Sequence, residues 1–144
     1  MIALEVHPSS TTCMLLSVFY RPLDALLTNF RDFANKYSRI GLSNLVVTSD
    51  FNYPNIDWNL GCHVVSDPDT EEFLISDDDF FLIQKNLYAT HDSSSQGNIL
   101  DIVQTNNDFL VEDVLVRPNA FDSDHHSLTF KLHAKKSRPN NIQL

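Results

Sequence analysis

A short run of apolar residues, Leu45-Val46-Val47, constrains the fold of this chain more than any other feature of the sequence. The three residues are apolar without polar alternation, a pattern typical of a short strand that is buried on both faces. We therefore expect a sheet with packed layers on both sides, supplied by the segments before and after this run.

The surrounding segments alternate between strand and helix patterns. Residues 1–20 predict a β-hairpin. Apolar residues at helical spacing predict a helix over Leu23–Arg39, and Asp67-Pro68 predicts the start of a second helix whose apolar face extends to Ile83. Three more strands are predicted near the C-terminus, over Asn98–Gln104, Asp113–Arg117 and Ser127–His133. This order indicates a mixed α/β fold.

Composition limits the classes of function. The 144 residues suit one domain, which we place at residues 1–133, with 134–144 as a polar tail. The net charge of −9 argues against binding nucleic acid through a basic surface, but it is compatible with an enzyme that handles phosphodiesters through a bound cation. Two cysteines are too few for a disulfide framework, and no apolar run is long enough to span a membrane, so we expect an intracellular protein without a membrane partner.

Polar residues gather just outside the predicted strands, where ligand sites of α/β sheets are common. Asp50 and Asn52 follow the strand at Leu45–Val47, and could orient a water and hold a phosphate oxygen or could simply form a turn. Asp124 and His125 precede the last strand, and could serve a metal ion or a phosphoryl oxygen or could belong to a solvated loop.

Two further residues carry open alternatives. Asp101 lies inside the apolar stretch Ile99–Val103, so it needs a partner unless it faces water at a sheet edge. Tyr20, at a strand end, could give its hydroxyl to a phosphate or could cap the core. Other polar residues predict no site. Asp77-Asp78-Asp79 predicts a solvated helix face, and His7, His63, His91 and His133 lack the spacing of metal ligands.

Four segments in order resemble the endonuclease domain of non-LTR retrotransposons, which belongs to the endonuclease/exonuclease/phosphatase superfamily and is similar to apurinic/apyrimidinic endonucleases. They are Ser17–Pro22, Ser49–Trp58, Gly97–Val103 and Ser123–Leu128, and together they cover about residues 1–132. The most specific is the stretch Asp-Phe-Asn-Tyr-Pro-x-Ile-Asp-Trp that begins at Asp50.

The resemblance implies roles for these residues in Mg²⁺- or Mn²⁺-dependent hydrolysis of DNA. Asp50 would orient or deprotonate the attacking water, while Asn52 and Tyr20 would hold the scissile phosphate. Asp124 would lie near the metal, His125 would stabilise the phosphoryl oxygens, and Asp101 would orient His125. A reverse transcriptase domain in the parent polyprotein and a nuclear location are implied as well.

The chain departs from the family pattern at two points. Ser49 stands where the family usually has Gly. The main metal-ligating Glu of the family lies upstream of the strand that matches Ile2–Val6, and Glu5 does not match it. We therefore expect a partial two-sheet α/β sandwich that lacks N-terminal strands, with weak or no activity. The alternatives are a non-catalytic remnant of such a domain and a phosphatase acting on phosphorylated small molecules.

One geometric prediction tests this assignment directly. Asp101 needs a partner and His125 needs an orienting acceptor, so their side chains should touch although they are 24 positions apart. Because neighbours on an extended segment alternate, His126 should point elsewhere.

Overall fold

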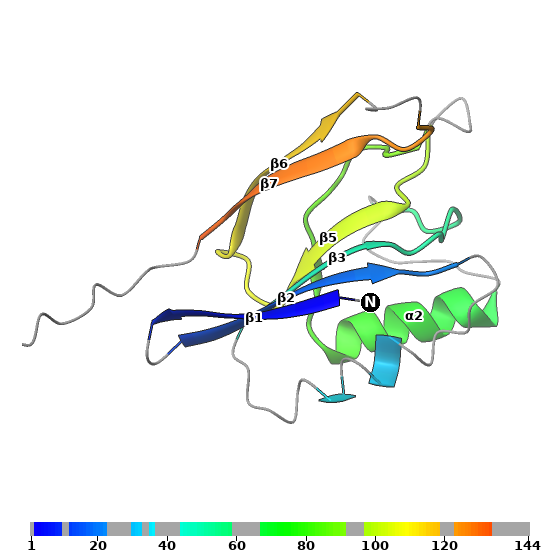
Figure 1. Cartoon of the computed structure of the whole chain (residues 1–144). Coiled ribbons are helices and arrows are strands. Elements are labelled where there is room, and N and C mark those ends of the chain that lie inside the picture. The colour runs from blue at the N-terminus through cyan, green and yellow to red at the C-terminus, as the bar shows by residue number, and fades with distance from the viewer. Residues whose placement is uncertain are drawn as a thin grey trace, which may run out of the picture.

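The computed structural model describes residues 2–9, 12–22, 30–32, 35–36, 44–58, 67–91, 97–118 and 123–133. A five-stranded sheet with the order β1-β2-β3-β5-β4 forms its centre, and β6 and β7 form a second sheet (Figure 1). The strands are β1 (Ile2–Ser9), β2 (Thr12–Tyr20), β3 (Asn44–Asp50), β4 (Ile83–Gln84), β5 (Asp101–Thr105), β6 (Val111–Arg117) and β7 (Ser127–Leu132).

The central strand β3 runs parallel to β2 and antiparallel to β5. As predicted, Leu45, Val46 and Val47 are all buried, and Val46 and Val47 have no exposed surface. The predicted hairpin is confirmed too, because β1 pairs antiparallel with β2. None of the described helices is long and apolar enough to cross a membrane.

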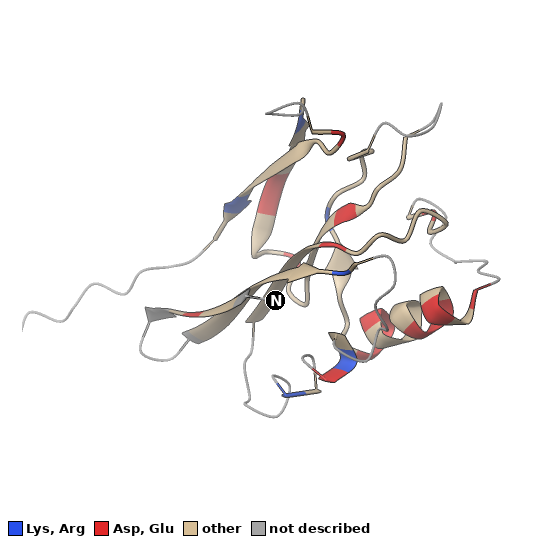
Figure 2. Cartoon of the chain, turned by 45° about the vertical axis from the view of Figure 1, so that its right-hand side comes forward, with Lys and Arg blue, Asp and Glu red and all other residues tan. Residues whose placement is uncertain are grey.

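The helix α2 (Pro68–Asp79) covers one face of the large sheet. Asp67 caps its N-terminus as expected, since the carboxylate accepts from the backbone N–H groups of Asp69 and Thr70. Phe73 packs among aromatic rings from β2, the residues after β3 and the helical segment at Phe30. Acidic residues recur along this helix (Figure 2).

The sheet of β6 and β7 covers the opposite face (Figure 1). Side chains alternate between the two cores along each central strand: Leu45 and Val47 face α2, whereas Val46 faces β6 and β7. The expected two-sheet α/β architecture is therefore present, with one layer on each side of β3.

The structure corrects several predicted boundaries. The second helix ends at Asp79, because the chain turns at Phe81, with φ 54°, and Ile83 then enters β4. The strand predicted over Asn98–Gln104 spans Asp101–Thr105. Its first part is irregular because the backbone N–H groups of Leu100 and Asp101 donate to a side chain, the Thr90 hydroxyl.

Other predicted boundaries shift by a few residues or fall on parts of the chain that the structure does not describe. The strand predicted over Asp113–Arg117 begins earlier, at Val111, and the last strand ends at Leu132. Of the helix predicted over Leu23–Arg39, residues 30–32 and 35–36 are described and helical, and the rest lies outside the described residues, as does the tail at 134–144.

Candidate active site

Two carboxylates meet where β3 ends and β5 begins. Asp50 and Asp101 are directly opposite each other in the antiparallel register of these strands. Cross-strand partners share a face of the sheet, and both side chains line the groove on the side of β7. The pairing of two strands that are far apart in the sequence thus brings two predicted site residues together.

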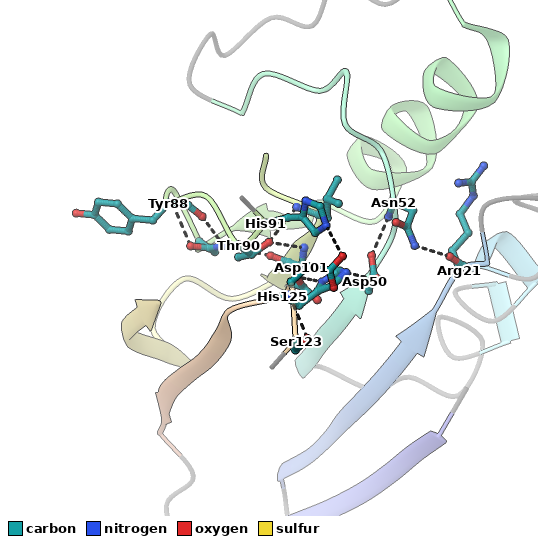
Figure 3. Close-up of polar contacts among 12 residues, drawn as sticks. Arg21, Asp50, Asn52, Tyr88, Thr90, His91, Asp101, Ser123 and His125 are labelled. Carbon is teal, nitrogen blue, oxygen red and sulfur yellow. Dashed lines mark hydrogen bonds and ion pairs between the residues drawn. The ribbon is translucent and has the colours of Figure 1, made fainter. Parts of the chain in front are cut away.

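His125 completes the cluster from the segment before β7. Its Nδ1 lies 2.8 Å from Oδ2 of Asp101, which confirms the predicted contact (Figure 3). Its Nε2 lies 4.0 Å from Oδ2 of Asp50. One imidazole therefore lies between two carboxylates.

Thr90, which the sequence analysis did not single out, holds the cluster together. Its fully buried hydroxyl accepts from the backbone N–H of Leu100 at 3.1 Å and of Asp101 at 3.0 Å. Its carbonyl accepts from the backbone N–H of His126 at 2.7 Å. Thr90 thereby fixes the start of β5 against the segment that carries His125. The sequence contains no signal for this role, since all these contacts are between residues far apart along the chain.

Asn52 adopts a turn conformation next to Asp50. Its φ is 53°, a left-handed conformation that Asn tolerates better than most residues. Its backbone N–H donates to Oδ1 of Asp50 at 3.2 Å, and its side-chain amide donates to the carbonyl of Arg21 at 3.0 Å. The turn interpretation of this segment is therefore correct locally, and the same turn places Asn52 beside Asp50.

Tyr20 reaches the same area from β2. It pairs with Asp50 in the parallel register of β2 and β3 and lines the groove with it. Its side chain is 62% exposed, so it does not cap the core.

The groove lies between the large sheet and β7 and has a volume of about 520 Å³. Its walls are mostly apolar, with Leu16, Val18, Leu128 and Phe130 among them. His126 lines this groove, whereas the ring of His125 joins the carboxylates, as the alternation of neighbours predicted.

The charges of the cluster shift the protonation of its members. Burial, and then the negative charge of Asp101, raise the pKa of Asp50 above its usual value. Burial alone would lower the pKa of His125, but the hydrogen bond and charge of Asp101, with the charges of Asp50 and Asp124, raise it. The arrangement therefore favours a protonated imidazole next to a carboxylate that binds a proton more readily than usual.

Asp124 lies on the outer side of the same segment and pairs with His91. Nε2 of His91 is 3.1 Å from Oδ2 of Asp124, and this hydrogen bond lowers the pKa of the carboxyl group. His91 has no sequence signal for a site, because the residues that it meets come from a distant segment. Among the described residues, two groups of side chains could hold a cation: Asp50, Asp101 and His125, and His91, Asp124 and His125.

The chain belongs to the family described as endonuclease-reverse transcriptase, which its sequence matches over residues 13–129. No curated protein matches the chain. Among solved structures, it is similar to the endonuclease domain of TRAS1, a telomere-specific non-LTR retrotransposon, with a TM-score of 0.72 and 14% sequence identity. The match covers 94% of this chain and 64% of that domain. At this identity the likeness supports the fold, and it agrees with the family assignment.

Proposed function

We propose that this chain is part of a divalent-cation-dependent endonuclease that hydrolyses phosphodiester bonds in DNA. The observation that carries the proposal is the contact of His125 with Asp101, beside Asp50, at the end of an open groove in a chain of this family. The partly desolvated carboxylate can act as a general base for water, and the protonated imidazole held by the other carboxylate can stabilise charge on the phosphoryl oxygens.

Asp50 is the proposed base for the attacking water. Its Oδ1 is held by the backbone N–H of Asn52, and its Oδ2 faces His125. Because burial and Asp101 raise its pKa, this carboxylate takes a proton more readily than an exposed aspartate.

His125 is the proposed donor to the phosphoryl oxygens. Asp101 fixes the ring by accepting at Nδ1, and the surrounding carboxylates favour its charged form. Asn52 and Tyr20 lie on either side of Asp50, one in the turn that follows it and one on the neighbouring strand, and would donate to the scissile phosphate.

The donor set suits Mg²⁺ or Mn²⁺. These cations prefer oxygen ligands, and Asp50, Asp101 and Asp124 supply carboxylate oxygens within the cation-binding groups. When bound, the cation would neutralise charge that develops on the phosphoryl group. It would also offset repulsion between DNA and a chain of net charge −9.

The chain spans 64% of the length of the retrotransposon endonuclease domain that it resembles. We therefore propose that efficient cleavage needs the longer domain, and that this chain alone cleaves DNA weakly or not at all. A reverse transcriptase domain in the same polyprotein and action in the nucleus belong to the same proposal.

Nicking of supercoiled plasmid tests the proposal. The chain and a form lengthened to the size of the related endonuclease domain are compared with Mg²⁺, with Mn²⁺ and with excess EDTA. We expect nicking that depends on the cation, rises by orders of magnitude in the longer form and is lost in Asp50→Asn. Nicking in EDTA would contradict the proposal. So would release of phosphate from inositol phosphates by a longer form that does not nick DNA, whereas a longer form with neither activity would indicate a non-catalytic remnant.

A further inference from the structure

We propose that His91, Asp124 and His125 form a second cation site, which prefers a transition-metal ion of the zinc class to Mg²⁺. One ligand atom from each residue lies within 4.8 Å of the others. The rings of His91 and His125 are in edge contact, with centroids 4.9 Å apart and planes at 73°. The sequence gives no sign of this set, because His91 is 33 positions from Asp124.

The chemistry of the donors selects the ion. Two imidazole nitrogens and one carboxylate oxygen suit Zn²⁺, Co²⁺ or Ni²⁺, whereas Mg²⁺ prefers a shell of oxygen ligands. Three protein ligands with a remaining position for water are a common arrangement for Zn²⁺. The cluster of Asp50, Asp101 and His125 is richer in oxygen, so the two groups differ in the ion that they favour.

The backbone holds these ligands in place before any ion binds. His91 and His125 are partners in an antiparallel bridge, and His91 exchanges backbone hydrogen bonds with Asn98 at 3.1 and 3.0 Å. The backbone N–H of His125 donates to the Ser123 hydroxyl at 3.1 Å. Little conformational freedom of the main chain is therefore lost on binding.

Asp101 adds an outer contact that metal-binding imidazoles commonly have. It meets Nδ1 of His125 at 2.8 Å, which leaves Nε2 as the nitrogen that would bind the ion. A carboxylate on the far nitrogen fixes the tautomer and raises the basicity of the ligand nitrogen.

Occupation of this site has a consequence that rests on the proposed function. Asp124 and His125 would then be withheld from the phosphodiester, so zinc-class ions would lower nicking at a fixed Mg²⁺ concentration. Binding itself does not depend on that function and is measured without nucleic acid.

Calorimetric titration of the chain with Zn²⁺ tests the site, together with the visible absorption of Co²⁺, which reports imidazole ligands. His91→Phe keeps an aromatic ring against His125 and removes the ligand. His133→Phe is the matched control, because His133 pairs with Glu112 at 2.8 Å, also a histidine–carboxylate pair but not part of any described three-ligand group. We expect one Zn²⁺ per chain, at least about tenfold weaker binding in His91→Phe, and unchanged binding in the control.

Imidazole resonances of the unmodified chain provide a test that needs no variant. Zn²⁺ should shift the signals of two of the six histidines through direct coordination by nitrogen, and Mg²⁺, which prefers oxygen ligands, should shift them less. Zn²⁺ binding that survives in His91→Phe, or that is lost equally in His133→Phe, would overturn the site. So would a titration in which Mg²⁺ competes with Zn²⁺ at equal concentration. A failure to nick DNA would leave this result unaffected.

Discussion

Each face of the large sheet has a carboxylate that is at least partly buried, but the surroundings of the two carboxylates differ. On the face toward β7, Asp50 lies at the end of an open groove with Asp101 and His125 around it. On the face toward α2, Asp77 is 6% exposed and accepts from the side-chain amide of Gln104, which is fully buried.

Burial is the largest cause of a raised pKa at both carboxylates, yet the consequences differ. At Asp77 the pKa rises to about 7; besides the charge of the neighbouring Asp78, its partner is the buried side-chain amide of Gln104, and it does not line the groove. At Asp50 the neighbours are two further titratable groups and a space that a ligand can enter. A raised pKa therefore indicates a candidate site when the carboxylate is also accessible to a ligand and lies among other titratable groups. Burial alone is not sufficient.

The largest predicted effect is on the face of the sheet toward β7, where the groove is open. In the longer endonuclease domain, His125→Ala should lower nicking by about 10² to 10⁴ while the fold persists, because the proposed donor to the phosphoryl oxygens is gone. Plasmid nicking and far-ultraviolet circular dichroism provide the two measurements. His133→Ala is the control and should be mild, because His133 pairs with Glu112 and does not line the groove; equal losses in the two variants would remove His125 from its proposed role.

The role of Asp101 can be separated from a purely structural one by the pH profile. Asp101 raises the pKa of His125, so Asp101→Asn should lower it. If the charged imidazole is the active form, nicking falls as the pH rises through the pKa of His125, and in Asp101→Asn it should fall at lower pH. An unshifted profile with uniformly lower activity would indicate that Asp101 merely supports the fold.

On the face toward α2, where Asp77 is buried, the expected effect is on the free energy of unfolding. Between about pH 4 and pH 7 the folded protein retains a proton on Asp77 that the unfolded chain has released. Stability should therefore fall as the pH rises through this range, and then stay level. A rise of the pKa from 3.8 to about 7 corresponds to at most about 4 kcal/mol.

Asp77→Asn removes the titrating group while it keeps an acceptor for Gln104. It should be more stable than the unmodified chain at pH 8, and the difference should shrink toward pH 4. Urea unfolding of both proteins across this range measures it. The same pH dependence in both proteins would show that Asp77 titrates normally.

Asp77 also shows where inference from the sequence fails. Three consecutive aspartates suggested a solvated helix face, but Thr70, Phe73 and Asp77 are spaced three and four apart and share the buried face of α2. The four-residue spacing from Phe73 to Asp77 indicates a shared helix face, whereas three consecutive charges indicate a face in solvent. The structure follows the spacing. What covers α2 is set by tertiary packing, which the local pattern does not encode.

The candidate-site residues were easier to predict than the burial of Asp77, because each lies in a sequence pattern that marks it within its own segment. Asp101 interrupts an apolar stretch, and Asp50 follows a strand buried on both faces, so each could be recognised within its own segment. Thr90 and His91 could not, since their roles arise from contacts with β5 and with the segment before β7. The fold followed from periodicity, while exact element ends depended on side-chain hydrogen bonds.

The face of the sheet toward β7 also exposes apolar side chains. Leu4 and Val18 are 58% and 50% exposed and lie on the same face as Leu16, which lines the groove. We expect the isolated chain to self-associate through this face. Leu4→Thr combined with Val18→Thr should shift the chain toward monomer in size-exclusion chromatography with light scattering. A sharp monomer peak and cooperative unfolding of the unmodified chain would contradict this expectation.

The smallest predicted effect concerns Ser49, which precedes Asp50 and pairs with Ile102 of the core beneath α2. Its hydroxyl is buried and has no hydrogen-bond partner among the described residues, unlike the carboxylate of Asp77. An unpaired buried hydroxyl destabilises the folded state, so Ser49→Ala should raise the free energy of unfolding by about 0.5–1 kcal/mol. Ser49→Gly, which restores the usual residue of the family, removes the same hydroxyl but adds backbone freedom that costs about 0.5–1 kcal/mol in a strand. In urea unfolding we therefore expect Ser49→Ala to be more stable than the unmodified chain, and Ser49→Gly to be about as stable as the unmodified chain. If Ala were the least stable of the three, the hydroxyl would have a partner.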